Sequence, residues 1–271
     1  MKIKNFILTA AVLGVGSISA CADTLSGNGS WQTWSPTVLN TPTTGPYWNG
    51  SSGDGPEYNI GWCLTGTGNC KISNPPGELA YYGNGNAAAS NVSFASSGVA
   101  QQVSLAGLFS NQNGVPPNGT NYFGWYTDNS GVVTLNPLLN STEAVGSYAT
   151  FTPTGTYGFY EENVQSPNTS YTANYFWFTN TSLDYTSGPG APATDGGQHF
   201  SIFGSAGSST YYLGLEDTPF ATSDLDYNDM VIKLEPAPEP SSLMLLAGGF
   251  CALAFGFVFR RHSHQSPNGN N

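Results

Sequence analysis

The fold class of this chain is decided by the segment YYLGLEDTPFATSDLDYNDMVIKLE, which spans residues 211–235. Its two apolar ends, Tyr211–Leu215 and Met230–Leu234, contain the aromatic and β-branched residues that favour strands. Between these ends lie acidic residues together with Pro, Ser and Asn, which are typical of turns. The segment therefore predicts two β-strands joined by an acidic loop.

Similar short segments recur through the rest of the chain. Further strands are predicted at residues 99–105, 121–127, 131–135, 148–151, 157–160, 171–178 and 200–203. A hairpin-like turn is predicted at Asp128-Asn129-Ser130, and only Ala87-Ala88-Ala89 suggests a turn of helix. The expected fold is all-β, an antiparallel β-sandwich or jelly roll over residues 77–235, with a less regular, turn-rich part at 23–76.

The charge distribution narrows the classes of partner. The chain has 271 residues and a formal net charge of −11. Between residues 23 and 235 the only basic side chains are Lys71 and Lys233, while all of the 17 acidic residues except Glu239 lie there. Such a field repels phosphate backbones and attracts divalent cations, so nucleic-acid binding is excluded and calcium is a natural partner.

The acidic loop is the candidate metal site. Its proposed ligands are Glu216, Asp217, Asp224, Asp226, Asn228 and Asp229. The alternating oxygen side chains at 224, 226 and 228 resemble the start of an EF-hand loop, and Glu235 falls at the twelfth position. Asp229 stands where the EF-hand requires Gly, however, and a strand follows directly. Two interpretations remain open: a calcium site, or a turn whose side chains cap backbone N–H groups.

Cysteine usage is typical of an oxidising compartment. Cys63 and Cys70 are the only two cysteines outside the apolar segments at the two ends of the chain, and they bracket a turn-forming loop. We predict a local structural disulfide between them.

Both ends of the chain predict export. Lys2 and Lys4 precede an apolar stretch, and small residues at Ala20 and Ala22 form a signal-peptidase site, which makes 1–22 a signal peptide. Cys21 also fits a lipobox, in which it would become a lipidated first residue. Either way the chain is expected to be exported.

The C-terminal end predicts a membrane anchor. A linker at 236–242 is followed by an uncharged apolar run at 243–259, long enough for a transmembrane helix, and then by a basic tail at 260–271. The arginines Arg260 and Arg261 are expected to stay cytoplasmic, which places the preceding domain outside that membrane.

The order Pro238-Glu239-Pro240, apolar helix and Arg260-Arg261 resembles the sorting signal of the PEP-CTERM family of Gram-negative exported proteins. The resemblance implies cleavage near the tripeptide by an exosortase, a membrane-embedded protease. It implies a protein held in the inner membrane before processing and at the cell surface, outer membrane or exopolysaccharide matrix afterwards. The alternative is a plain single-span anchor.

A second resemblance concerns the acidic loop itself. Glu216-Asp217 after a strand, and Asp224–Asp229 before a final strand, resemble the signature of an uncharacterised family of bacterial extracellular domains. This resemblance implies a β-sandwich, and it implies no catalytic activity.

Enzyme motifs are missing from the sequence, so a non-catalytic protein is expected. His199 is the only histidine between residues 23 and 235, and a structural or surface role is expected for it. Glu161-Glu162 could suggest a glycosidase acid pair, but adjacent strand residues point to opposite faces and could not flank one bond, so a solvated strand end is expected instead.

The alternative function is a carbohydrate-binding module. Its exposed aromatic side chains would be Trp31, Trp34, Trp48 and Trp62. The other interpretation of these rings is that they pack against the sandwich.

Overall fold

The computed structural model describes residues 23–34, 45–49, 59–66, 72, 74–108, 119–164, 174–188, 194–221 and 223–238. Nearly all regular structure in these ranges is antiparallel strand, which confirms the all-β prediction. The predicted signal peptide and transmembrane segment lie outside the described residues. Within the described ranges, no helix is both long enough and apolar enough to cross a bilayer.

The first sheet contains seven strands. They are β1 (Thr24–Gly27), β5 (Val92–Ala95), β7 (Thr120–Asn129), β8 (Val132–Asn140), β10 (Thr156–Val164), β11 (Asn174–Phe178) and β12 (Tyr185–Ser187). The main path runs β1-β5-β10-β11-β12, and β7 pairs with both β10 and β8. The long strand β10 is therefore central, with β11 beside it and both β5 and β7 hydrogen-bonded to it.

The second sheet contains eight strands. They are β2 (Ser30–Gln32), β3 (Ala80–Asn84), β4 (Ala87–Ala88), β6 (Gln101–Leu108), β9 (Tyr148–Phe151), β13 (Phe200–Gly204), β14 (Tyr211–Leu215) and β15 (Met230–Pro236). The order is β2-β3-β13-β14-β15-β6-β9, with β4 paired to β3. The two strands predicted around the acidic loop, β14 and β15, are thus direct neighbours.

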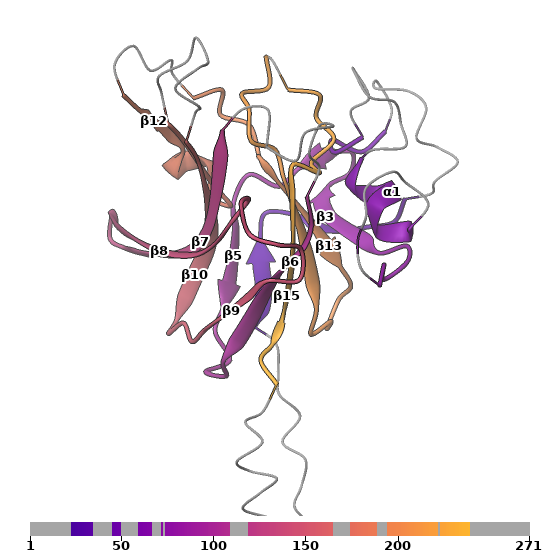
Figure 1. Ribbon diagram of the computed structural model, residues 1–271, viewed down its shortest axis with the longest axis horizontal. Coiled ribbons are helices and arrows are strands. Elements are labelled where there is room, and N and C mark those ends of the chain that lie inside the picture. The colour runs from indigo at the N-terminus through magenta and orange to yellow at the C-terminus, as the bar shows by residue number, and fades with distance from the viewer. Residues whose placement is uncertain are drawn as a thin grey trace, which may run out of the picture.

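The two sheets face each other, as Figure 1 shows with β7 and β10 on one side and β6, β13 and β15 on the other. Their inner faces form one buried cluster, in which Phe94 and Phe159 of the first sheet join Leu213 and Ile232 of the second. Each such side chain contributes about 1.5–3 kcal/mol when it leaves water. The packing of two antiparallel sheets around one core is that of a β-sandwich.

A short helix and a second buried cluster cover the outer side of the second sheet. The helix α1 (Ile60–Thr65) lies beside β3 and β13 in Figure 1. Its Ile60 packs with Trp48, Tyr81 and Phe203. The sequence prediction missed this helix, although its caps are readable: the Asn59 side chain accepts from the Trp62 N–H, and Gly66 adopts a left-handed conformation. A 3₁₀ helix, η2 (Thr181–Leu183), follows β11.

The suggested helical turn at Ala87-Ala88-Ala89 is wrong. Ala87 and Ala88 form β4, which pairs with Gly83 and Asn84 of β3. Three alanines carry too little intrinsic helical stability to nucleate a helix. Strand pairing satisfies their backbone groups instead.

Of the two interpretations of the four tryptophans, packing against the sandwich is the one that the structure bears out, and the exposed surface of the carbohydrate-binding alternative is not found at these described residues. Trp34 and Trp48 are buried, and Trp31 and Trp62 are partly buried against the two clusters. Trp48 meets Trp34 edge-to-face at a ring-centroid distance of 5.0 Å. The turn-rich segment folds back onto the second sheet, so these rings gain more by packing than by staying in water.

Strand boundaries differ from the predicted ones by a few residues. The β7–β8 hairpin turns at Ser130 and Gly131, which both have positive φ, rather than at 128–130. This is a two-residue turn of the kind that matches the twist of paired strands. The predicted 171–178 strand is β11, and residues 171–173 lie outside the described ranges.

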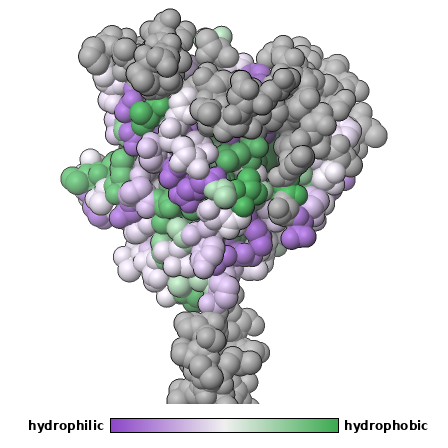
Figure 2. Space-filling model, viewed as in Figure 1, coloured by the Kyte–Doolittle hydropathy of each residue, from purple (hydrophilic) through white to green (hydrophobic). Residues whose placement is uncertain are grey.

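The described chain begins and ends at the same end of the sandwich. The Asp23 carboxylate accepts a hydrogen bond from the Gln101 side chain, and the Ala237 N–H donates to the Ala100 carbonyl. Residues 23 and 237 therefore both lie beside the start of β6. On the face shown in Figure 2, hydrophobic residues form separate patches among hydrophilic ones.

Candidate cation site

The acidic loop occupies the opposite end of the sandwich from the chain ends. Leu215 of β14 pairs directly with Met230 of β15, so residues 216–229 leave the sheet and return at the same edge. From Met230, β15 runs through Pro236 toward the other end, a length of roughly 20 Å at about 3.3 Å per residue.

Carboxylates of this loop converge in two groups that share Glu216. The first group, here called the loop triad, is Glu216, Asp224 and Asp226. The second, here called the sheet triad, is Glu216, Asp217 and Asp229. Within each triad, one oxygen of every carboxylate lies within 4.8 Å of the others. That spacing equals twice a calcium–oxygen bond of about 2.4 Å, so each triad can surround one ion.

The loop is held by hydrogen bonds on two sides. The Ile60 N–H at the start of α1 donates to the Asp226 carbonyl at 2.9 Å, and the Tyr227 hydroxyl donates to the Gln198 carbonyl at 2.7 Å. Leu225 and Tyr227 both have φ near +60°, a conformation that costs free energy for residues with a Cβ. Helix α1 and the buried Tyr227 ring compensate for that cost by fixing the loop against the second sheet.

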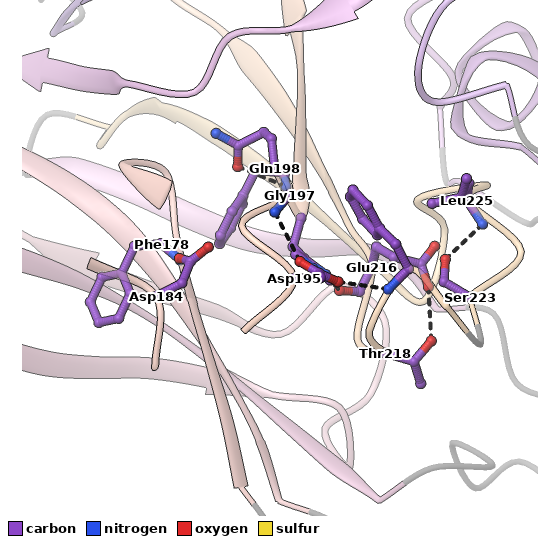
Figure 3. A network of polar contacts seen from close by, with 12 residues as sticks. Phe178, Asp184, Asp195, Gly197, Gln198, Glu216, Thr218, Ser223 and Leu225 are labelled. Atoms are coloured by element: carbon purple, nitrogen blue, oxygen red, sulfur yellow. Dashed lines mark hydrogen bonds and ion pairs between the residues drawn. The ribbon is translucent and has the colours of Figure 1, made fainter. Parts of the chain in front are cut away.

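Some of the acidic side chains also cap backbone groups, as the alternative interpretation predicted. Asp226 accepts from the Asn228 N–H, and Asp229 accepts from the Asp217 N–H at 3.0 Å. Figure 3 shows Ser223 accepting from the Leu225 N–H and the Thr218 hydroxyl donating to Glu216. Capping leaves Glu216 Oε2 without a hydrogen-bond partner among the described residues, although this side chain is buried.

Glu161 is a further buried carboxylate, on the inner face of the first sheet, and the prediction of a solvated strand end is wrong for it. Its side chain is fully buried, whereas Glu162 lies half-buried on the other face of β10. Neither carboxylate oxygen of Glu161 has a hydrogen-bond partner among the described residues. The sequence signal was the alternation from Phe159, an inner-face residue, to Glu161 two positions later.

The electrostatics of the site follow from burial and like charge. Burial, with the charges of Asp224 and Asp217 added, raises the pKa of Glu216 to about 8. Burial also raises the pKa of Glu161 and of Asp229 well above their ordinary values, and neighbouring carboxylates add to both shifts. Such groups become stable as anions only when a cation reaches them.

No positive side chain of the described chain balances these carboxylates. Lys233 is the only lysine or arginine in the described ranges, and its ammonium pairs with Glu235 at 2.6 Å on β15. Glu235, at the twelfth position of the EF-hand-like spacing, therefore lies on the strand beyond the cluster. The loop resembles an EF-hand in spacing but not in structure.

His199 supports the site. Its ring is fully buried and stacks on Trp177 with centroids 3.6 Å apart. Nδ1 lies 2.8 Å from the Glu216 carbonyl, and Nε2 faces the Asp195 carboxylate. Asp195, at the centre of Figure 3, also accepts from the Gly197 and Phe220 N–H groups. Both ring nitrogens of His199 have polar partners, so the ring holds the backbone carbonyl of Glu216 in position.

All six ligands predicted from the sequence are described, and five of them, the carboxylates, fall in the two triads. The sixth, Asn228, is buried and donates from its side-chain amide to Asp226 at 2.7 Å. Cys63 is buried in the cluster under α1, and its predicted partner Cys70 lies outside the described residues, so the disulfide stays a prediction.

The two facing sheets and the buried carboxylates define an all-β domain with a candidate cation site at one end. Residues 236–261 match the PEP-CTERM protein-sorting motif, so this is an exported, membrane-sorted protein that carries an exosortase-processed signal. The match begins at Pro236, the last residue of β15. No curated protein and no solved structure matches the chain.

The sorting residues themselves are only partly described. Pro238 is the last described residue, and Glu239, Pro240, Arg260 and Arg261 lie outside the described ranges, as do Ala20 and Ala22 of the predicted signal-peptidase site. The second resemblance, to an uncharacterised extracellular domain family, stays a prediction.

Proposed function

We propose that this chain is a non-catalytic surface or matrix protein, released from its membrane anchor by an exosortase, whose β-sandwich is stabilised by calcium. The sorting motif at 236–261 supports export and processing by an exosortase, and the non-catalytic surface or matrix role is part of the proposal. The calcium part of the proposal is supported by the convergence of the carboxylates in two triads and by the buried oxygens of Glu161 and Glu216 that have no hydrogen-bond partner among the described residues.

Calcium suits this set of ligands better than other common ions. The converging groups are carboxylates, hard oxygen ligands, and neither triad contains histidine or cysteine, which zinc prefers. Magnesium demands a near-ideal octahedron and retains several waters, whereas calcium accepts irregular sets of six to eight oxygens. An exported protein also meets calcium at concentrations that support weak and moderate sites.

Processing is tested at the C-terminus of the mature protein. The tagged chain is expressed in an exosortase-containing host, beside the triple variant Pro238→Ala, Glu239→Ala, Pro240→Ala. Mass spectrometry is expected to find cleavage near residue 240 in the wild type only. An intact tail in both proteins would instead indicate a plain membrane anchor.

Calcium binding is tested by thermal unfolding of the chelator-treated chain with and without calcium. At 100 times the dissociation constant, one bound ion adds about 2.7 kcal/mol, which raises the Tm of a domain of this size by roughly 5–10 °C. The Asp226→Asn variant is expected to show a smaller rise.

Glu235→Gln is the matched control for the calcium experiment. Glu235 pairs with Lys233 outside the cluster, so its variant is expected to respond to calcium like the wild type. Equal Tm values of the wild type with and without calcium would contradict the calcium proposal. Loss of the response in Glu235→Gln would indicate an EF-hand-like loop instead.

A further inference from the structure

Glu161 is the one carboxylate of the site that comes from the first sheet. In β10 it lies between Phe123 of β7 and Trp177 of β11, and all three side chains are fully buried. Phe159, two residues earlier on the same face, packs in the core between the sheets. The Glu161 carboxylate therefore points into the space between the sheets, at the end where the acidic loop lies.

A chain of amide hydrogen bonds brings the sheet triad against the same inner face. Asn163, the next inner-face residue of β10, donates to the Asn121 side chain at 2.6 Å. Asn121 in turn donates to Asp217 Oδ2 at 3.0 Å. Asp217 is thus fixed beside β7 and β10, although it belongs to a loop of the second sheet.

The charges of two sheet-triad residues also act on Glu161, in line with its place on the inner face of β10. The charges of Asp217 and Glu216 are the ones that add to burial in raising the Glu161 pKa. Asp217 and Glu216 also raise the pKa of Asp229. Glu161 itself is not a member of either triad, whose oxygens lie within 4.8 Å of one another, so its carboxylate would complete the shell of an ion that the triad already holds.

We propose that the sheet triad and the loop triad each hold one calcium ion, and that Glu161 is a further ligand of the ion in the sheet triad. This inference rests on the calcium binding proposed above and extends it. Two ions match the two separate convergence points that share Glu216. The ion in the sheet triad would tie the two sheets together, because its ligands come from both.

The physical reason is that the Glu161 carboxylate is fully buried and has no hydrogen-bond partner among the described residues, so without a cation it can only be protonated. A buried carboxylate without a hydrogen bond or a cation is strongly unfavourable, and neither of its oxygens meets a donor among the described residues. A calcium ion, which takes six to eight oxygens, supplies the missing partner and needs the extra ligand.

Stoichiometry is the first measurement. The full-length chain in detergent is treated with chelator, titrated with calcium, and examined by native mass spectrometry and isothermal titration calorimetry. Two bound ions are expected in the wild type. One bound ion would overturn the two-ion assignment while leaving the proposed function in place, and no bound ion would overturn both.

The second measurement compares two neighbouring carboxylates on one strand. Glu161→Gln is expected to lose one ion, or to weaken one site at least about tenfold, and to keep the other. Glu162→Gln is the matched control, because Glu162 lies on the opposite face of β10, and it is expected to bind both ions as the wild type does. Equal binding by the wild type and Glu161→Gln would overturn the role of Glu161.

Thermal unfolding separates ligation from a merely structural role. Without calcium, Glu161→Gln is expected to have at least the Tm of the wild type, because the variant removes an acid whose ionised form is costly to bury without a cation. With calcium its Tm is expected to rise by about half as much as that of the wild type, since one ion is lost. Glu161→Asp, which keeps the charge but shortens the side chain, is expected to bind the ion more weakly than the wild type. An unchanged affinity in Glu161→Asp, or a Tm lowered in Glu161→Gln without calcium, would contradict ligation.

Discussion

Single buried carboxylates determine much of the chemistry of this protein, and Asp184 shows the effect away from the cation site. Its Oδ1 accepts from the Phe178 N–H at 2.7 Å, as Figure 3 shows. Burial raises the pKa of Asp184 to about 8, and the Asp195 charge adds to the shift. The folded protein therefore holds a proton on this side chain at pH values where the unfolded chain has lost it.

The consequence is a pH dependence of stability. A group whose folded pKa is raised contributes stability below its unfolded pKa, near 4, and loses it as the pH rises toward 8. The variant Asp184→Asn removes this contribution. The free energy of unfolding of the variant, relative to that of the wild type, is expected to rise by about 1–2 kcal/mol between pH 4 and pH 8, after allowance for partial solvent exposure.

Urea unfolding of both proteins at several pH values measures the difference. The free energy of unfolding of the wild type is subtracted from that of the variant at each pH. This difference cancels the contributions of the other carboxylates in the domain. A difference that stays constant between pH 4 and pH 8 would show that Asp184 is ionised in the folded protein.

Adjacent elements fix the acidic loop as much as its own residues do. Gly214 of β14 lies directly under the loop, and a Cβ added there would be 2.3 Å from the Tyr227 carbonyl. Since that contact is with backbone, the loop itself would have to move. The glycine is therefore a condition for the position of residues 224–229.

Gly214→Ala is expected to lower both the free energy of unfolding, by about 2 kcal/mol, and the affinity for calcium. Ser201→Ala in the neighbouring strand is the control, since Ser201 opposes Gly214 and only donates a 3.3 Å hydrogen bond to its carbonyl. That variant is expected to cost less than about 1 kcal/mol and to leave calcium binding unchanged. Denaturant unfolding and calcium titration measure both effects. Equal losses of stability and of calcium affinity in the two variants would contradict this account.

At the scale of the whole molecule, the candidate cation site and the sorting motif lie at opposite ends. The match to the motif begins at Pro236, and β15 separates that residue from the acidic loop by the length of the sandwich. A domain anchored through its C-terminal end would therefore present the acidic loop away from the membrane.

Asp23 joins the two sheets at the end near the sorting motif. Its carboxylate accepts from the Tyr157 hydroxyl of the first sheet and from the Gln101 amide of the second. Its carbonyl also accepts from the Tyr211 hydroxyl at 3.3 Å. The predicted signal-peptide cleavage after Ala22 would make this buried residue the first of the mature chain.

Asp23→Ala is expected to lower the free energy of unfolding by about 3 kcal/mol, because several buried donors lose their acceptor together. Asp128→Ala is the comparison: the exposed Asp128 side chain accepts one hydrogen bond, from Gly131 in the β7–β8 hairpin. Its loss is expected to cost about 1 kcal/mol or less. Chemical denaturation would contradict the account if the two variants lost the same stability.

The sequence was most informative where a pattern is local. The strands at 148–151 and 211–215 were predicted with their observed bounds, and the proposed loop ligands between Asp224 and Asp229 lie close in sequence. Short strands such as β4 and β12 were missed because two or three residues are too few to show the alternation of side chains that is typical of a strand. Their strand conformation depends on a partner strand that local sequence does not reveal.

The sequence by itself determined the all-β class, the acidic loop and the sorting motif, because each depends on residues adjacent in the chain. Only the tertiary structure decided that the lead-in tryptophans pack inside and that Glu161 faces the acidic loop. Strand alternation places Glu161 and Glu162 on opposite faces, but it cannot say which face is covered. That choice is made by the second sheet, whose residues lie far away in the sequence and close in space.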